Sequence, residues 1–211
     1  NVGDTVAALL GDKDDLVLAI EPSAEFQRYL VRNFGTDEHV TIVNTACGER
    51  NAELRVSVLR RDGTAVFTEA QQGERLRMST LDAVVREHPA FAEPDVVKID
   101  TDGFDFAVID GARELLARSR PAVLFECDHF DAPDYVTRLR AALQHLRECG
   151  YAHFAAYDNY GYLMGSFALD DLRPFEQLLF YQLSSPFCFF DLLAMPDDAL
   201  VVFLAREREH Y

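Results

Sequence analysis

The chain has 211 residues, and its 36 acidic and 20 basic side chains give a formal net charge of −16 at pH 7. Because nucleic acids and anionic membrane surfaces repel such a chain, we expect neither as a partner. Apolar residues make up 49% of the chain, beside only 11 glycines and 8 prolines, which excludes disordered and fibrous classes. We expect one domain over residues 1–211.

Strands and helices are predicted to alternate through the first two thirds of the chain. Short continuous apolar runs predict buried parallel strands, and apolar residues at helical spacing predict helices. In chain order we expect a strand at 16–20, a helix at 24–33, a strand at 40–43, a hairpin at 56–67 around Asp62-Gly63, a helix from Thr80 to before Pro89, a strand at 96–99, a helix at 104–117, a strand at 122–125 and a helix at 135–149. This order predicts an α/β fold with a mainly parallel sheet.

The last third of the chain has a different pattern. Residues 151–157 and 200–205 are predicted to be strands that pair antiparallel at a sheet edge. The aromatic-rich stretch 175–193 predicts helical segments interrupted at Pro186. We expect this stretch either to close a ligand pocket or to form a homodimer interface.

Three features concern the location of the protein. No apolar run reaches the roughly 20 residues that a membrane span needs, and the first residues lack a signal-peptide pattern. The four cysteines contain no C-x-x-C pair and no disulfide-type spacing. We therefore expect a soluble protein in the reducing cytoplasm.

Acidic residues stand directly after three of the predicted strands, namely Glu21, Asp100 and Glu126. Ligands of an open parallel sheet bind outside the carboxyl ends of its strands, so we expect these side chains near a ligand site. The spacing from Gly3 to Glu21 is that of a glycine turn and a carboxylate that binds ribose hydroxyls.

Each acid also has a purely structural explanation. Glu21 is then a solvated strand end, and Asp82 is the cap of its helix. Asp100, Asp102 and Asp105 are then a turn and a helix N-terminus, where the helix dipole favours negative charge. Neither a serine-hydrolase elbow, G-x-S-x-G, nor a phosphate-binding loop, G-x-x-x-x-G-K-[ST], occurs in the sequence.

Several motifs stand in a specific order along the chain. They read N-V-G-D-T, A-I-E-P-S, S-T-L-D and V-K-I-D-T-D-G-F-D-F-A-V-I-D-G-A, followed by a strand that ends in F-E. This order resembles the FkbM-like family of S-adenosylmethionine-dependent methyltransferases. The most specific segment, residues 98–112, is similar to the family's K-I-D-V-E-G-x-E-x-x-V-L-x-G-A.

The resemblance implies a Rossmann-like class I methyltransferase fold of the mainly parallel seven-stranded type, with residues 200–205 as an antiparallel C-terminal strand. It implies that the first strand, which should precede Asn1, is missing from this chain. The implied activity is O-methylation of a hydroxyl on a small molecule, natural product or sugar, with S-adenosyl-L-methionine as cofactor.

The resemblance also implies which residues contact the cofactor. These are Asn1 and Gly3 under its methionine part, Glu21 at the ribose hydroxyls, Ala46 and Cys47 near the adenine, and Asp100 at the methionine amino group or the reaction site.

A hydroxyl acceptor needs a group that takes its proton during methyl transfer. The candidate catalytic residues at this sheet edge are Asp102, Glu126 and His129, with Asp128 beside them. His129 has the most suitable ordinary pKa. A divalent metal ion held by Asp100, Asp102 and Asp128 is an alternative that we do not favour.

Two other functions are compatible with the sequence. A nicotinamide-dependent oxidoreductase shares the Gly3 to Glu21 spacing. A non-catalytic Rossmann-like domain would use the aromatic stretch 175–193 for binding or assembly.

Overall fold

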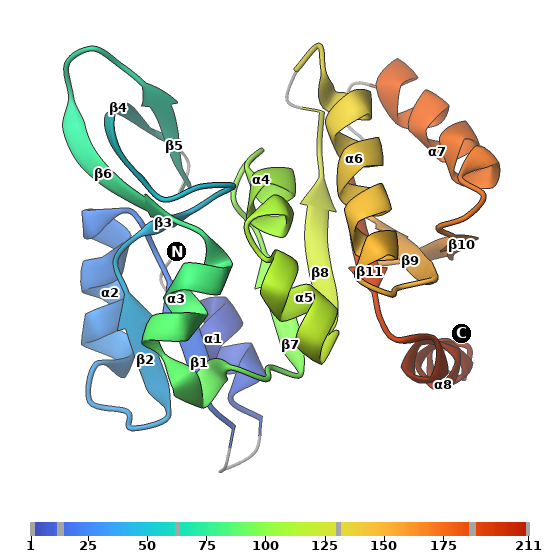
Figure 1. The fold of residues 1–211 in the computed structure, drawn as a ribbon, viewed down its shortest axis with the longest axis horizontal. Helices are drawn as coiled ribbons and strands as arrows, with labels where there is room; N and C mark the ends of the chain where they lie inside the picture. Colours follow the sequence, from blue (N-terminus) through green and yellow to red (C-terminus); the bar gives the residue numbers. More distant parts are fainter. Residues whose placement is uncertain (1–2, 12–14, 62–63, 130–131, 186–188, 210–211) are drawn as a thin grey trace. The chain divides into compact units, whose positions relative to one another are not determined.

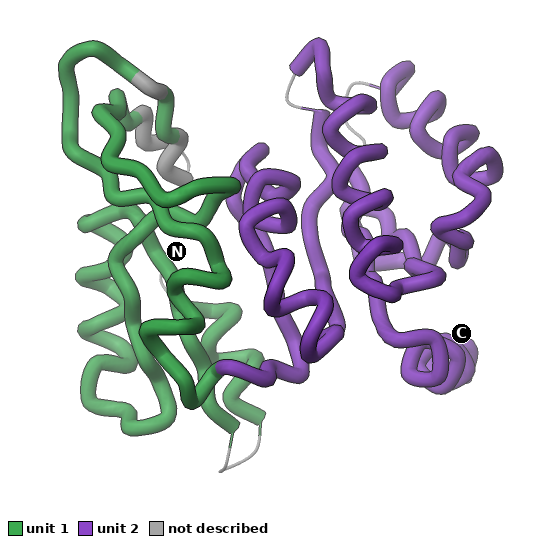
Figure 2. Tube along the Cα trace, in the orientation of Figure 1, with its two compact units in different colours: residues 1–91 green, residues 92–211 purple. Residues whose placement is uncertain are grey.

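The computed structural model describes residues 3–11, 15–61, 64–129, 132–185 and 189–209. The chain divides into two compact units, Asn1–Phe91 and Ala92–Tyr211 (Figure 2), and each is described by itself. The prediction of one domain over the whole chain stays a prediction. No helix in the described part of the chain is long and apolar enough to cross a membrane.

The first unit begins with a parallel pair of strands and two helices. They are α1 (Asp4–Leu9), β1 (Val17–Ile20), α2 (Ala24–Phe34) and β2 (Val40–Val43). Val6, Val17, Ala19 and Leu30 form their shared core. Ser23 caps α2, because its hydroxyl accepts a hydrogen bond from the Phe26 N–H at 3.4 Å.

A four-stranded sheet completes the first unit. Its order is β3-β6-β4-β5, with bounds β3 (Ala46–Cys47), β4 (Ala52–Arg61), β5 (Thr64–Glu69) and β6 (Glu74–Ser79). Antiparallel β4 and β5 confirm the predicted hairpin, although Asp62 and Gly63 lie outside the described residues. Helix α3 (Leu81–Glu87) and the 3-10 turn η1 (Pro89–Phe91) follow. The cap of α3 is Thr80, whose hydroxyl accepts from the Ala83 N–H at 3.1 Å, so the assignment of the cap to Asp82 was wrong.

The second unit is built on a five-stranded sheet of order β10-β9-β11-β8-β7 (Figure 1). The strands are β7 (Val96–Ile99), β8 (Ala122–Cys127), β9 (His153–Asp158), β10 (Leu163–Ala168) and β11 (Phe190–Ala194). The helices are α4 (Asp105–Asp110), α5 (Arg113–Ser119), α6 (Tyr135–Glu148), α7 (Arg173–Ser184) and α8 (Asp197–Glu207). The predicted helix at 104–117 is therefore two helices, because the chain leaves helical geometry at Gly111 and Ala112.

The fold is mixed α/β, but the prediction of one mainly parallel sheet was wrong. In the second unit only β7 and β8 pair in parallel, whereas β11 pairs antiparallel with both β8 and β9. Among the described residues the sheets have two, four and five strands, and no seven-stranded sheet is present. The chain returns from β10 to β11 through α7, which connects the two strands on either side of β9.

The prediction of a strand at 200–205 was also wrong, because these residues lie in α8. Leu200, Phe203 and Leu204 have the i, i+3, i+4 spacing of one helix face, and that face packs on Ala155 and Tyr157 of β9. Val201 and Val202 are exposed, which a fully buried strand would not permit. The strand of this region that pairs antiparallel with its neighbours is β11.

Candidate active site

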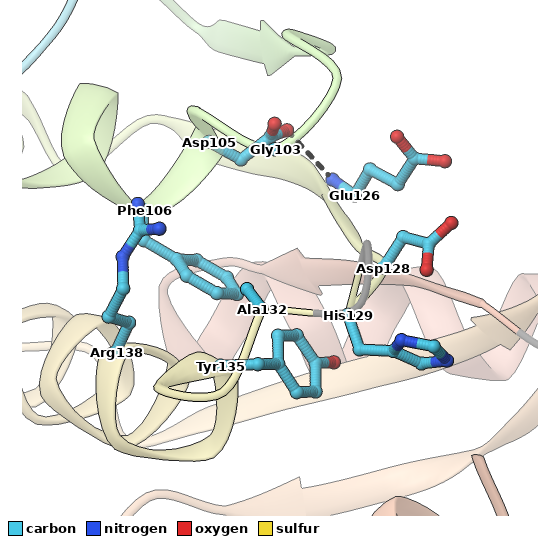
Figure 3. A pocket seen from close by; sticks show the side chains of 9 residues that line it. All are labelled: Gly103, Asp105, Phe106, Glu126, Asp128, His129, Ala132, Tyr135 and Arg138. Carbon is cyan, nitrogen blue, oxygen red and sulfur yellow. Dashed lines mark hydrogen bonds between the residues drawn. The ribbon is translucent and has the colours of Figure 1, made fainter. Parts of the chain in front are cut away.

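A pocket of the second unit lies where β7 and β8 end and where α4 and α6 begin (Figure 3). Its lining residues are Gly103, Asp105, Phe106, Glu126, Asp128, His129, Ala132, Tyr135 and Arg138. The space amounts to about 330 Å³, counting the part that is open to solvent. The carboxyl ends of parallel strands are where ligands of α/β sheets bind, so this pocket is the candidate active site of the second unit.

The turn between β7 and α4 shapes one side of this pocket. Asp102 and Gly103 have φ angles of 48° and 98°, and this left-handed backbone turns the chain directly into α4. Asp102, a predicted catalytic residue, lies in that turn but is not among the residues that line the pocket.

Asp105 is the buried carboxylate behind the turn, with 3% of its surface exposed. One oxygen accepts hydrogen bonds from the Thr101 hydroxyl at 2.7 Å and the Thr101 N–H at 3.3 Å. The other oxygen accepts from the Glu126 N–H at 3.2 Å. Burial raises the pKa of Asp105, although these hydrogen bonds oppose the increase. Asp105 thus ties the turn to the end of β8.

Glu126 presents the most strongly perturbed carboxyl group that faces the pocket. Partial burial, together with the negative charges of Asp105, Asp100, Asp128 and Asp191, raises its pKa to about 7. Phe125 and Cys127 on either side are fully buried, so the alternation along β8 directs Glu126 away from that core. At neutral pH this carboxyl group can therefore both accept and release a proton.

Asp191 and Lys98 complete the charged surroundings of Glu126. Asp191 in β11 is the register partner of Glu126, so both side chains lie on one face of the sheet. Burial raises the pKa of Asp191, and the nearby charge of Lys98 opposes this increase. Lys98 also forms an ion pair with Asp100, whose side chain is 60% exposed.

Aromatic rings form the opposite side of the pocket. The Phe106 and Tyr135 rings are 5.9 Å apart, and the His129 and Tyr135 rings are 6.2 Å apart in an edge contact. The guanidinium of Arg138 lies 5.8 Å from the centre of the Phe106 ring, within the range of a cation–π contact. The predicted catalytic residues Glu126 and His129 thus share one pocket (Figure 3).

A buried amide supports the pocket from behind. Gln182 of α7 is fully buried, accepts a hydrogen bond from the Tyr135 hydroxyl at 2.8 Å and donates one to the backbone oxygen of Cys127. These bonds join α6 and α7 to the last residue of β8. Burial raises the pKa of both Tyr135 and Cys127, so their hydroxyl and thiol stay protonated.

The predicted ribose-binding residue, Glu21, lies in the first unit at the end of β1. Its carboxylate is buried and accepts a hydrogen bond from the Ser23 N–H at 2.8 Å. The Asn44 side chain donates to the backbone oxygen of Glu21 at 2.9 Å, which joins the ends of β1 and β2. A fixed carboxylate at a strand end fits a ribose diol, because its oxygens accept two hydroxyl hydrogen bonds.

A pocket of the first unit adjoins these strand ends. It is lined by Pro22, Ser23, Ala24, Asn44, Thr45, Val56, Phe67 and the segment 74–77. Neither Glu21 nor the predicted adenine neighbours Ala46 and Cys47 are among the lining residues. Burial raises the pKa of Cys47 to about 12, so its thiol is protonated at neutral pH.

Three further residues were predicted to contact the cofactor, namely Gly3, Asn1 and Asp100. Gly3 has a φ of 110° and forms the N-cap of α1, a left-handed position that favours glycine. Asn1 lies outside the described residues. Asp100 is at the end of β7, in the second unit, where its ion pair with Lys98 holds it.

Sequence reasoning did not single out Tyr135, Arg138 or Asp191. Tyr135 and Arg138 line the pocket one helical turn apart, and their i, i+3 spacing on a predicted helix was the available signal. Asp191 had no local signal, because its strand was not predicted. Among the described residues, no group of three or more His, Cys, Asp or Glu side chains is placed to hold a metal ion.

Comparison with known proteins identifies the family. Residues 1–152 match the family model described as the methyltransferase FkbM domain. A solved structure, the methyltransferase FkbM from Methylobacillus flagellatus KT, is similar with a TM-score of 0.50 and 16% sequence identity, over 72% of this chain and 36% of that chain. The likeness shows a shared fold, and the match spans about a third of that protein's length. A comparison with curated proteins finds no match. Because the family model covers well over half of the chain, this protein belongs to the FkbM methyltransferase family.

Proposed function

We propose that the chain is an S-adenosylmethionine-dependent methyltransferase that methylates a hydroxyl of a small molecule, natural product or sugar. The family match supports methyl transfer and the cofactor. The observation that carries the rest is Glu126, a pocket carboxyl group whose pKa is raised to about 7. A nicotinamide-dependent reaction has no comparable observation in its favour.

In this proposal the cofactor supplies an electrophilic methyl group on a sulfonium. The hydroxyl oxygen of the acceptor would receive this methyl group, with the thioether of S-adenosylhomocysteine as the leaving group. Glu126 takes the hydroxyl proton, which its pKa near 7 allows at neutral pH. Asp105 holds the backbone N–H of Glu126 and thereby fixes the position of the base.

Two carboxylates, each considered within its own unit, are proposed to recognise parts of the cofactor. The Glu21 carboxylate, fixed by the Ser23 N–H, would accept the ribose hydroxyls. Asp100 would attract the ammonium group of the methionine part, in exchange for its ion pair with Lys98.

Calorimetric titration with S-adenosylhomocysteine and with NAD tests the cofactor. We expect S-adenosylhomocysteine to bind and NAD not to bind. Replacement of Glu21 by Ala should weaken the binding of S-adenosylhomocysteine at least tenfold. Transfer of radioactive methyl to a panel of sugars and polyols tests the reaction, with mass spectrometry to locate the methyl group on oxygen. Glu126→Gln should abolish transfer but leave S-adenosylhomocysteine binding unchanged. The proposal would be refuted if the chain bound NAD but not S-adenosylhomocysteine, or if Glu126→Gln kept full activity.

We also propose a homodimer through the aromatic stretch 175–193. In α7 the side chains of Phe180 and Tyr181 are 76% and 57% exposed, which is unusual for aromatic residues. Sedimentation equilibrium should show a dimer that the double change Phe180→Ser and Tyr181→Ser converts to a monomer. A monomeric wild-type chain would contradict this proposal.

A further inference from the structure

Arg138 is the cationic arginine of the pocket, and the proposed reaction gives it no role. It stands in the first turn of α6, on the same helix face as Tyr135, and its side chain is half-buried beside the Phe106 ring. In Figure 3 its guanidinium and the carboxyl groups of Glu126 and Asp128 lie on opposite sides of the Phe106 ring. In this view the Phe106 ring lies between the cation and the base.

The guanidinium of Arg138 forms no hydrogen bond and no ion pair within the described part of the chain. This is notable in a protein with 36 acidic and 20 basic residues, where an acidic neighbour is easy to supply. Arg140, two residues further along α6, is paired with Glu176. The buried acid of the pocket, Asp105, accepts hydrogen bonds from Thr101 and from the Glu126 N–H. The N–H groups of Arg138 are therefore available to a ligand.

The aromatic rings define what kind of ligand fits between the cation and the base. Phe106, Tyr135 and His129 follow one another at 5.9 and 6.2 Å between ring centres. Phe106 and Tyr135 are 7% and 3% exposed, so they form a rigid apolar wall, and the half-buried His129 ring is the aromatic group with more area open to a ligand. The planar guanidinium of Arg138 matches a carboxylate, sulfate or phosphate.

We propose that the methyl acceptor carries an anionic group, which Arg138 binds while the hydroxyl to be methylated lies at Glu126. This inference deepens the proposed methyl transfer and rests on it for the role of the hydroxyl. The binding of the anion itself does not depend on the reaction. A positively charged acceptor, attracted by the carboxyl groups of the pocket, is the competing outcome.

Saturation-transfer NMR with small sugar probes tests the proposal without turnover. The probes are the anions D-glucuronate and D-glucose 6-phosphate, neutral D-glucose and cationic D-glucosamine. The proteins are the wild-type chain, Arg138→Gln, Arg138→Lys and the matched control Arg140→Gln on the same helix. Circular dichroism checks that each variant is folded.

We expect at least one anion to bind the wild-type chain and Arg140→Gln more tightly than glucose does. Arg138→Gln should bind that anion at least tenfold more weakly, because a charge-assisted hydrogen bond pair is lost. Arg138→Lys should retain part of the affinity, because lysine keeps the positive charge but lacks the planar guanidinium that forms two parallel hydrogen bonds. Glucose binding should be equal in all four proteins.

Three results would overturn the proposal: no anion binds the wild-type chain, Arg138→Gln binds the anions normally, or glucosamine binds best. Titration of the same proteins with S-adenosylhomocysteine distinguishes a failure of the anion proposal from a failure of the proposed methyl transfer. Anion binding through Arg138 without cofactor binding would refute methyl transfer alone, whereas cofactor binding without anion binding would refute the acceptor class alone.

Discussion

The raised pKa of Glu126 implies that the site destabilises the fold at the pH where it would act. A carboxyl group whose pKa is higher in the folded chain contributes no penalty at low pH, where it is protonated in both states. As the pH rises from its ordinary pKa of 4.5 to about 7, the unfolded chain ionises first and folding becomes less favourable. Glu126→Gln removes this penalty, so the variant should be more stable than the wild-type chain at pH 8.

The size of the gain follows from the pKa values. A change from 4.5 to about 7 corresponds to at most about 3.4 kcal/mol, at about 1.36 kcal/mol for each pH unit. Because Glu126 is only partly buried, solvent screening reduces this value, and we expect about 1–2 kcal/mol at pH 8. Roughly 40% of the gain should remain at pH 5.5, where the unfolded carboxyl group is already ionised.

Urea unfolding followed by circular dichroism at pH 5.5 and pH 8 measures both values. The control is Glu93→Gln, which removes the same charge from an exposed position of the second unit. An equal gain for both variants would show a general effect of the net charge of −16. The reasoning would be refuted if Glu126→Gln were no more stable than Glu93→Gln at pH 8, or if its advantage did not decrease at pH 5.5.

The remaining predictions concern activity, core and helix cap. The initial rate of methyl transfer should rise about tenfold per pH unit below pH 7 and level off above it, because only ionised Glu126 accepts the proton. A rate that does not change with pH would contradict this prediction. Gln182→Leu should cost about 1–3 kcal/mol of unfolding free energy, because the Tyr135 hydroxyl and the Cys127 carbonyl lose the buried amide and keep their mutual hydrogen bond at 3.3 Å. A loss below about 0.5 kcal/mol in urea unfolding would argue against that network. Thr80→Ala should cost about 1 kcal/mol, and Asp82→Ala only a few tenths; equal losses in the same assay would assign the cap to Asp82.

Local patterns were sufficient to predict the parallel strands and most of the helices. The runs at β1, β2, β7 and β8 are short and mostly apolar, so their type follows from their own residues. The segment 200–205 was misassigned because every residue in it is apolar, and periodicity cannot then separate a strand from a helix. The tertiary contact that decides it is the packing of Leu200 on β9.

The edge strand β10 was missed for a related reason. Its residues read L-M-G-S-F-A, where a glycine and a serine weaken the strand pattern. Pairing with β9 makes it a strand, and that pairing contains an irregularity between Leu163 and Gly165. Long-range pairing of this kind cannot be deduced from a window of neighbouring residues.

The candidate site could be predicted as far as residues follow the ends of parallel strands. Glu126 stands directly after an apolar run, and this position alone suggested that it faces a ligand. Asp191 could not be placed in this way, because β11 runs antiparallel to β8. In an antiparallel strand the beginning, not the end, reaches the ligand edge of the sheet, so Asp191 near the start of β11 lies opposite Glu126 near the end of β8. Its charge is one of those that raise the pKa of Glu126. The chemistry proposed for the base therefore depends partly on strand pairing between residues far apart in the chain, which composition and spacing do not reveal.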